Sequence, residues 1–595
     1  VSYVREQNLY VYDLAAREER AITRGGGGPV SYGVAEFVAQ EEMERYTGYW
    51  WAPDESRIAF TRVDESAVAE VERIEVLASG ARVTRQRYPA AGARNAEVQL
   101  LIAPLGGGGG DAAVRADLGP DSDIYLARVD WFPDSRDLAV QRQSRDQKTL
   151  TLLALDAASG QARELLTERS ETWVDLSDEF TFLPKSRQFV WASSRSGYRH
   201  LYLYDFEGRL LRPLTSGQWM VSNDLRERAI RGIDEAHGLL YFVANRETPI
   251  ERHLYAASLL DPALPLRRVT QERGWHGISM SRDATMYLDT YSTPEQPPSY
   301  TLRATSGASV AELEPNRLDA GHPYFAYLAQ HSPTEFGTLA AEDGQTLHYQ
   351  IVKPRVLEPG RRYPVVIDVY GGPGVQNVRR AWGGPEEFFQ QMLAQRGYVV
   401  FSLDNRGSGM RGVHFENVLY RQLGAVEVRD QVRGAEFLRT LPYVDPRRIG
   451  MFGWSYGGYL TLMCLMQSPS TFAAGIAGAP VTDWSLYDTH YTERYLGTPL
   501  QNAAGYAQSN VLTHAAGLSR PLLLLHGMAD DNVLFANSTA LMQRLQSLDK
   551  PFDLMTYPGA KHSLLRHADT GPHAYAQILR FLDAHLGSAA PGSRE

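Results

Sequence analysis

Cysteine is almost missing from this chain of 595 residues: only Cys464 occurs, so no internal disulfide can form. This disfavours the disulfide-rich extracellular folds. Apolar runs are short as well, because none approaches the roughly 18 residues that a membrane-spanning helix needs. No signal-peptide pattern occurs at Val1. We therefore expect Cys464 to be inert core and the chain to contain no membrane span.

Positive charge is not in excess, and metal-binding patterns are missing. Sixty basic residues stand against seventy acidic ones, a formal net charge of −10, which makes nucleic acid an unlikely partner. No group of Cys and His residues has metal-ligand spacing, so we expect neither a metal nor another cofactor. The length requires more than one domain.

One motif stands out against this background, Gly453-Trp454-Ser455-Tyr456-Gly457. It fits the G-x-S-x-G pattern of a sharp strand-to-helix turn that exposes a serine hydroxyl. Residues 448–452 read as a short buried strand and residues 459–466 as the apolar helix that follows. A glycine-rich turn is the alternative, but the flanking elements favour Ser455 as a nucleophile.

A serine needs a base, and the base needs an orienting acid, in the order Ser, acid, His along an α/β-hydrolase chain. Residues 521–525 read as a buried strand that opens into a polar loop at Asp530. His562 follows the next predicted strand, 552–556. We expect Asp530 to orient His562 and His562 to act as base and then acid. His526 competes as base and Asp531 as acid, but His526 precedes the acid and ends a buried strand.

The segment before the motif also suits a hydrolase. Residues 363–370 read as a strand that runs into Gly371-Gly372-Pro373-Gly374, where hydrolases build part of the oxyanion hole. The backbone N–H of Tyr456 is the second expected donor. A further strand at 397–404 and an amphipathic helix at 427–438 complete the alternation. Strands alternating with helices predict a parallel sheet covered on both faces.

The first half of the chain has a different texture, with many short β-rich runs. Turn residues recur at Pro133, Pro184, Asp234 and Asp283, in steps of 51, 50 and 49 residues. A period near fifty with several short strands predicts the blades of a β-propeller. About five and a half repeats are present, and the run at 8–13 resembles the closing strands of a blade whose start is absent.

At this point the chain resembles the dipeptidyl peptidase IV group of prolyl oligopeptidase-type serine peptidases. The resemblance covers essentially the whole chain and is strongest after about residue 330. It implies a propeller at 1–325, incomplete at its N-terminus because the family has eight blades, and an α/β-hydrolase domain at 326–595. The residues that carry it are 453–459, 529–533, 491–495, 479–481 and 87–92.

The resemblance gives a role to Glu41 and Glu42. In the family, two adjacent glutamates on a propeller excursion bind the free α-amino group of the peptide substrate. Charge counting alone favours a different interpretation, a solvated acidic start of a helix stabilised by the helix dipole. A carboxylate pair at a fixed distance from Ser455 would make the enzyme remove dipeptides.

Other roles are implied in the same way. The Tyr370 hydroxyl would complete the oxyanion hole, and Asn532 would hold the carbonyl of the N-terminal substrate residue. Arg494 is a possible helper, while the family's propeller arginine has no identified counterpart here. The pocket for the residue before the cut would be lined by Tyr456, Val481, Trp484, Tyr487, Tyr491 and Val533. The alternative is that Tyr487 and Tyr491, four apart on a helix, are simply core.

These observations predict a serine exopeptidase that releases N-terminal dipeptides with Pro or Ala in the second position. Its partners would be peptides with a free N-terminus, and the family implies a homodimer. A periplasmic location is expected by analogy, with cytoplasmic as the alternative. An acylaminoacyl-peptidase or oligopeptidase of the same architecture, a carboxylesterase and a non-catalytic propeller scaffold stay open.

Overall fold

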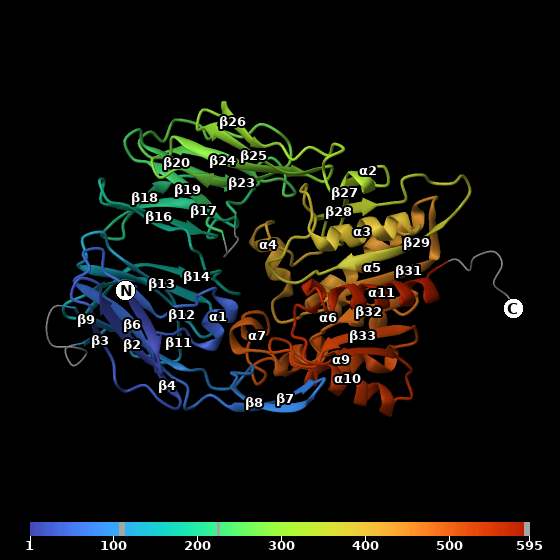
Figure 1. Cartoon of the computed structure of the whole chain (residues 1–595), viewed down its shortest axis with the longest axis horizontal. Helices are drawn as coiled ribbons and strands as arrows, with labels where there is room; N and C mark the ends of the chain where they lie inside the picture. Colours follow the sequence, from blue (N-terminus) through green and yellow to red (C-terminus); the bar gives the residue numbers. More distant parts are fainter. Residues whose placement is uncertain (106–112, 223–226, 588–595) are drawn as a thin grey trace.

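The computed structural model describes residues 1–105, 113–222 and 227–587. Figure 1 shows two halves with different architecture. Small antiparallel sheets follow one another in an arc through the first half, from blue to green, and one large sheet flanked by helices forms the second half. Among the described residues, no helix has the length and apolar character needed to cross a membrane.

The described part of the first half contains six antiparallel sheets in chain order, besides a separate two-stranded hairpin, which confirms the predicted propeller-type architecture. Pro133, Pro184 and Asp283 lie in the turn between the first and second strands of their sheets, and Asp234 ends the first strand of its own. The period near fifty therefore marks the same turn in four successive blades. The strands of the last four sheets are β11 (Ile124–Trp131), β12 (Asp137–Ser144), β13 (Thr149–Asp156), β14 (Ala162–Arg169), β15 (Phe180–Leu183), β16 (Gln188–Ser193), β17 (His200–Asp205), β18 (Leu210–Pro213), β19 (Ile230–Asp234), β20 (Leu239–Ala244), β21 (His253–Ser258), β22 (Arg267–Arg268), β23 (Trp275–Met280), β24 (Met286–Thr293), β25 (Gln296–Ala304) and β26 (Ser309–Glu314).

The first two sheets are less regular. The first has three strands within the described residues, and the second carries two excursions toward the other half of the molecule. One excursion is the short helix α1 (Phe37–Glu42), and the other is a two-stranded hairpin that runs along the bottom of Figure 1. Their strands are β1 (Ser2–Arg5), β2 (Asn8–Asp13), β3 (Glu18–Ala21), β4 (Val30–Tyr32), β5 (Tyr49–Trp51), β6 (Arg57–Asp64), β9 (Glu97–Pro104) and β10 (Val114–Arg115), with β7 (Glu70–Leu77) and β8 (Gly80–Arg87) in the hairpin.

The second half is built on one sheet with eight described strands in the order β27-β28-β30-β29-β31-β32-β33-β34. The strands from β30 onward are parallel, and the first two are antiparallel additions at one edge. Their near-continuous apolar sequences suit a sheet that is covered on both faces. Their bounds are β27 (Thr334–Ala340), β28 (Thr346–Val352), β29 (Tyr363–Val369), β30 (Val399–Leu403), β31 (Val444–Trp454), β32 (Ala474–Gly478), β33 (Leu522–Gly527) and β34 (Asp553–Tyr557).

Helices cover both faces of this sheet (Figure 1). The predicted helices at 427–438 and 459–466 correspond to α5 and α6, and the predicted strands correspond to β29, β30, β31, β33 and β34. The helices are α2 (Phe325–Leu328), α3 (Pro385–Gln395), α4 (Val413–Glu416), α5 (Val426–Thr440), α6 (Tyr456–Gln467), α7 (Thr489–Leu496), α8 (Ala503–Ser509), α9 (Val511–His514), α10 (Ala536–Ser547) and α11 (Gly571–His585). Cys464 lies on α6 and is fully buried, as expected.

The two halves meet along several contacts that hold α7 against the propeller, where α7 also contacts α1. The guanidinium of Arg145, from the turn after β12, binds the buried carboxylate of Glu493 on α7. The backbone N–H of Gly92 donates to the same carboxylate over 2.8 Å. The predicted domain boundary at 325/326 falls in the connection between β26, which ends at Glu314, and β27, which begins at Thr334.

Candidate active site

Ser455 stands at the tight turn between β31 and α6. Its backbone has φ 58° and ψ −119°, a conformation that residues other than glycine rarely adopt. The close approach of β31 and α6 requires glycine, because a Cβ on Gly453 would lie 2.2 Å from the carbonyl oxygen of Gly457, and one on Gly457 would lie 2.1 Å from that of Val369 at the end of β29. The strained turn is the geometry that a nucleophile elbow needs to present its hydroxyl.

Asp530 and His562 are brought together by the loops after β33 and β34. The Asp530 Oδ2 and His562 Nδ1 atoms are 2.8 Å apart. The other carboxylate oxygen accepts the backbone N–H groups of Asn532 and Val533, both at 3.0 Å. Asp530 is only 2 % exposed. Its orientation toward the imidazole is therefore fixed from both sides.

The pKa of Asp530 reflects two opposing effects. Burial raises it, but hydrogen bonds with His526 and His562 outweigh burial and hold the pKa below its usual value. His526 is fully buried, with Nδ1 at 2.7 Å from the Ser538 hydroxyl and Nε2 at 2.9 Å from the Val533 carbonyl. His526 thus occupies the interior position expected of a structural histidine. Its Nε2 atom also lies 3.2 Å from Oδ2 of the candidate acid, Asp530.

The histidine loop is also attached to the elbow. The indole N–H of Trp454, the residue before the nucleophile, donates to the carbonyl oxygen of His562 over 3.1 Å. Asp531, the alternative acid, turns outward instead and pairs with Lys561. The structure therefore places Asp530, and not Asp531, against His562.

Tyr370 directly follows β29 and lies beside the elbow. Its ring centroid is 6.2 Å from that of Tyr456. Burial and then the charge of Glu42 raise the pKa of Tyr370 to about 12, so its hydroxyl keeps its proton at neutral pH. The backbone N–H of Tyr456 opens α6, and the first N–H groups of a helix have no partner within it. Both predicted oxyanion donors, the Tyr370 hydroxyl and the Tyr456 N–H, therefore lie at the elbow and can donate a hydrogen bond.

The Tyr456 side chain is held by a residue that the sequence did not single out. Its hydroxyl donates to Glu427 Oε1 over 2.6 Å. Glu427 is fully buried near the start of α5, and its Oε1 also accepts the N–H of Gly424 at 2.9 Å. Its only signal in the sequence is the position of an acidic residue on the apolar face of an amphipathic helix.

The predicted aromatic wall gathers into one cluster. The Trp484 ring stacks on Tyr491 at 5.7 Å and 13°, and lies 5.6 Å from Tyr456 and 6.0 Å from Tyr487. Val481 and Val533, each at most 3 % exposed, belong to the same apolar core. The expectation that Tyr487 and Tyr491 share a helix is wrong. Tyr487 precedes α7 in extended backbone because Asp488 caps that helix.

Tyr487 instead contacts the catalytic loop. Its hydroxyl donates to Asn532 Oδ1 over 2.8 Å, and the amide nitrogen of Asn532 donates to Glu41 Oε1 over 2.6 Å. Asn532 thus joins the aromatic cluster, the Asp530 loop and the propeller excursion. Glu41 and Glu42 end α1 and do not start it, so that part of the alternative is wrong, although Glu41 is exposed and Glu42 is half-buried. The helix dipole disfavours carboxylates at that end.

The two glutamates face an acidic partner across the domain interface. The carboxyl group of Asp488 is near enough to that of Glu42 for each to shift the pKa of the other. Burial and then the charge of Asp488 raise the pKa of Glu42 well above its usual value. For Glu41, burial and Asp488 raise the pKa while His562 is near enough to oppose the shift. Asp488, missed in the sequence, is therefore part of this acidic site.

Arg494, the possible helper, lies on α7 with its guanidinium between the two halves. Its Nε donates to Gln147 Oε1 over 2.8 Å, and its Nη2 lies 3.0 Å from His490 Nδ1. Burial lowers the pKa of Arg494, but the neighbouring Tyr495, Asp175 and Glu42 outweigh burial and raise it. Arg494 is thus the nearby cation that balances part of the acidic site.

Comparison with known proteins agrees with this geometry. The family model described as "Dipeptidyl peptidase IV (DPP IV) N-terminal region" matches residues 1–298, and the model of the prolyl oligopeptidase family matches residues 387–589. Dipeptidyl peptidase 8 of Mus musculus is 33 % identical over 99 % of this chain and 74 % of its own length.

Two further relatives come from other kingdoms. A probable dipeptidyl-aminopeptidase B of Emericella nidulans is 32 % identical over 100 % of this chain and 67 % of its own length. The crystal structure of Porphyromonas gingivalis dipeptidyl peptidase 4 superposes with a TM-score of 0.91 at 32 % identity, covering 98 % of this chain and 81 % of the other. This chain therefore belongs to the dipeptidyl peptidase IV family of prolyl oligopeptidase-type serine peptidases.

Proposed function

We propose that this chain is a serine dipeptidyl peptidase that releases N-terminal dipeptides with proline, or less readily alanine, as the second residue. The observation that carries the proposal is the 2.6 Å hydrogen bond between Asn532 and Glu41. It ties the propeller carboxylates to the loop whose Asp530 orients His562. An amine anchor and a nucleophile are thereby held at one fixed separation.

The chemistry follows from the site. The Ser455 hydroxyl oxygen attacks the carbonyl carbon of the peptide while His562 takes the hydroxyl proton. The carbonyl oxygen of the peptide gains negative charge. The Tyr456 N–H and the Tyr370 hydroxyl donate to that oxygen. The amine leaves with the proton from His562, and an ester remains on Ser455. Water, deprotonated by His562, then releases the dipeptide and restores the serine.

The separation of anchor and nucleophile sets the product length. A substrate ammonium group held by Glu41 and Glu42 leaves room for two residues before the reactive carbonyl. The Asn532 amide nitrogen has a second N–H that can bind the intervening carbonyl. A blocked N-terminus would bury carboxylates without a cation, which is costly. The site therefore selects peptides by their free amino group.

The aromatic cluster sets the second residue. Flat rings from Tyr456, Trp484 and Tyr491 suit the rigid ring of proline, while alanine fills the same space less well. A missing methylene or two in an apolar pocket costs about 1–3 kcal/mol. Alanine is therefore accepted at a lower rate, and larger aliphatic residues are rejected.

The test compares Gly-Pro and N-acetyl-Gly-Pro amides that carry a chromogenic leaving group. The expected result is cleavage of the free form, little cleavage of the acetylated form, and none of either by Ser455→Ala. Equal rates on both forms would contradict the amine requirement and favour an acylaminoacyl-peptidase, an oligopeptidase or a carboxylesterase. Unchanged function in Ser455→Ala would favour a non-catalytic scaffold.

Matched variants locate the anchor. Glu41→Gln and Glu42→Gln keep the side-chain shape but remove the charge, so we expect kcat/KM on Gly-Pro amide to fall at least about 100-fold. Glu44→Gln is the control, because this nearby glutamate accepts from Tyr46 instead. The proposal fails if all three variants behave alike.

The homodimer implied by the family stays a prediction, which light scattering of the purified chain would test.

A further inference from the structure

A buried asparagine is bonded to the segment that carries Tyr370. Asn405 lies in the loop between β30 and α4 and is fully buried. Its Nδ2 donates to the carbonyl oxygen of Gly371, the residue that follows Tyr370, over 3.0 Å. The backbone next to a proposed oxyanion donor is therefore held by a side chain from another loop.

The backbone after Tyr370 is closely packed on two sides. A Cβ on Gly371 would lie 2.6 Å from Asn405 Oδ1. A Cβ on Gly372 would lie 2.7 Å from a ring carbon of Tyr370 and 2.9 Å from one of Tyr456. Because these atoms are already in contact, a shift of the backbone at Gly371 also shifts Tyr370 relative to the elbow.

The amide of Asn405 is fixed in one orientation. Its Oδ1 accepts from Gln431 Nε2 of α5 over 2.9 Å. Its Nδ2 donates to the carbonyl oxygen of Arg406 over 2.8 Å, in addition to that of Gly371. In this orientation the amide oxygen has a donor and the amide nitrogen has two acceptors. The hydrogen bond to Gly371 is thus part of a buried network in which each group has a partner.

The helix α5 supports both proposed oxyanion donors from one face. Glu427 and Gln431 are four residues apart on this helix, and both are fully buried. Residues at this spacing share one face of a helix. Glu427 accepts from the Tyr456 hydroxyl, while Gln431 donates to Asn405. One helix face thereby reaches the segments of both donors.

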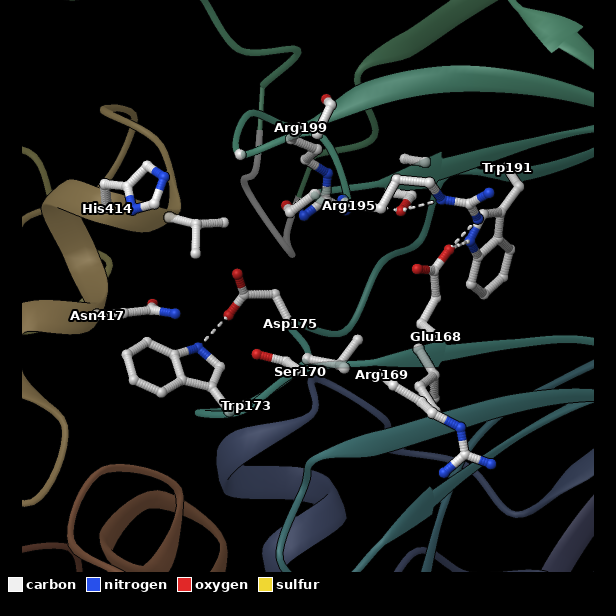
Figure 2. Close-up of a pocket in the computed structure, with 18 residues that line it drawn as sticks. Glu168, Arg169, Ser170, Trp173, Asp175, Trp191, Arg195, Arg199, His414 and Asn417 are labelled. Carbon is white, nitrogen blue, oxygen red and sulfur yellow. Dashed lines mark hydrogen bonds and ion pairs between the residues drawn. The ribbon is translucent and has the colours of Figure 1, made fainter.

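The loop that carries Asn405 is also attached to the propeller. It leads into α4, whose His414 lines the cavity between the two halves together with Trp173 of the propeller (Figure 2). Just before α4, the carbonyl oxygen of Met410 accepts from Asn245 Nδ2 of the propeller over 2.8 Å. The loop is therefore held by β30 at one end and by the propeller at the other.

We propose that Asn405 is a positioning residue, which holds the backbone at Gly371 so that the Tyr370 hydroxyl stays directed at the developing negative charge. The inference rests on the proposed function, in which Tyr370 is one of two oxyanion donors. Such donors stabilise the transition state because they are fixed before the reaction and need no reorganisation during it. Loss of Asn405 therefore lowers kcat and leaves KM nearly unchanged.

The test is a double-mutant cycle on the cleavage of Gly-Pro amide by the full chain. Tyr370→Phe removes the donor, so we expect kcat to fall about 100-fold. Asn405→Ala leaves the hydroxyl present but frees the backbone that carries it, and kcat should fall about tenfold. In the Tyr370→Phe background, Asn405→Ala should lower kcat by less than about twofold, because the hydroxyl through which it acts is gone.

Asp343→Asn is the matched control. Asp343 binds the guanidinium of Arg406, next to Asn405 in the same loop, over 2.8 Å, and its side chain is 40 % exposed. Arg406 keeps its buried partner Asp430 in this variant. The change weakens an ion pair of the loop without touching Gly371, so kcat should stay within about twofold of the parent.

Asn405→Ser is a second variant, in case Asn405→Ala does not fold. Its hydroxyl stops one bond short of the amide nitrogen and does not reach Gly371, but it leaves a smaller cavity than alanine does. Circular dichroism and thermal unfolding give the folded fraction of each variant, and kcat is compared at equal amounts of folded protein. Asn405→Ser should show the same loss of about tenfold in kcat.

Three results would overturn the inference and leave the proposed function standing. They are a parent-like kcat in both Asn405 variants, an equal loss of kcat with and without the Tyr370 hydroxyl, and an equal loss in Asp343→Asn. The proposed function fails in a different way. If Tyr370→Phe keeps the kcat of the parent, Tyr370 is not an oxyanion donor, and the role of Asn405 falls with it.

Discussion

Arg145 of the propeller holds Glu493 of α7 through two hydrogen bonds, 2.7 Å from Nη2 to Oε1 and 3.0 Å from Nε to Oε2. The Glu493 side chain is only 2 % exposed, and that of Arg145 is 20 % exposed. A paired, planar contact of this kind fixes both position and orientation. The helix it fixes carries Tyr491 and Arg494, so the propeller sets the geometry of the substrate site.

Arg145→Ala should therefore weaken catalysis from a distance. It leaves the buried Glu493 without its cation, at a cost of about 3 kcal/mol in the free energy of unfolding. We expect kcat/KM on Gly-Pro amide to fall at least about tenfold, with most of the change in KM. Denaturant unfolding and steady-state kinetics measure the two effects.

The control for that variant is Arg209→Ala, which removes an exposed propeller arginine from a surface pair with Asp205. Surface pairs contribute about 0–1 kcal/mol, so this change should be almost neutral. If Arg145→Ala were equally neutral, α7 would be held by other contacts and the propeller would not set the site.

Glu427 should act through Tyr456. Glu427→Ala leaves the Tyr456 phenol without its buried acceptor, a loss of about 1–3 kcal/mol. Because the Tyr456 N–H is a proposed oxyanion donor, we expect kcat to fall about tenfold while KM changes little. Glu427→Gln keeps an acceptor oxygen and should restore most of kcat. A merely structural role would lower the stability of both variants without separating kcat from KM.

The pair Glu42 and Asp488 should make substrate binding depend on pH. The pKa of Glu42 is raised, so at low pH the pair keeps its protons and cannot neutralise an ammonium group. Affinity for a free-amine peptide should rise with pH through that raised pKa. It should fall again above about pH 8, where the substrate amine loses its proton. The plot of 1/KM against pH is thus bell-shaped.

Glu42→Gln should remove the acidic limb of that bell. It should also change stability in a defined direction. A carboxyl that binds its proton more tightly when folded destabilises the fold as pH rises from its unfolded pKa toward its folded pKa. The variant should therefore be more stable than the parent at neutral pH in thermal unfolding. A 1/KM profile with an unchanged acidic limb would exclude Glu42 as its source.

Asp530→Asn tests the orienting acid. The imidazole keeps its place but loses the partner that fixes its tautomer, so kcat should fall about 10⁴-fold. Asp530 has a lowered pKa, so its stabilising contribution is complete above an unfolded value of about 3.9 and is lost as pH falls through the folded value. The stability difference from the parent should therefore shrink below that range. Asp531→Asn, which only loses the Lys561 pair, is the control.

The elbow could be predicted from sequence because its constraints are local. Gly453 is required by its contact with the backbone of Gly457, four residues away, and the strand and helix around Ser455 follow from short apolar runs. Asp530 and His562 could be predicted for the same reason, since each lies in the loop that directly follows a buried strand. The propeller period could be recognised because the same turn recurs in four successive blades.

Residues that act across the domain interface could not be predicted in this way. Asp488 reads as an ordinary helix cap, and only the fold brings it to Glu42. The four-residue spacing of Tyr487 and Tyr491 suits a helix, but the cap at Asp488 starts that helix after Tyr487. Glu427 and Arg145 are charged residues in common patterns, and their partners are distant in sequence. The contacts of Asp488 and Arg145 depend on how the two halves dock, whereas that of Glu427 depends on packing within the catalytic half.

The central claim is that the amine anchor and Ser455 are two residues apart along the bound peptide. Mass spectrometry of Ala-Pro-Gly-Pro-Lys-Pro-Ala-Ala digested by the purified chain tests it directly. The account predicts stepwise loss of Ala-Pro, Gly-Pro and Lys-Pro, and no cleavage of the same peptide after N-acetylation. Release of single residues or tripeptides, internal cuts, or digestion of the acetylated peptide would contradict it.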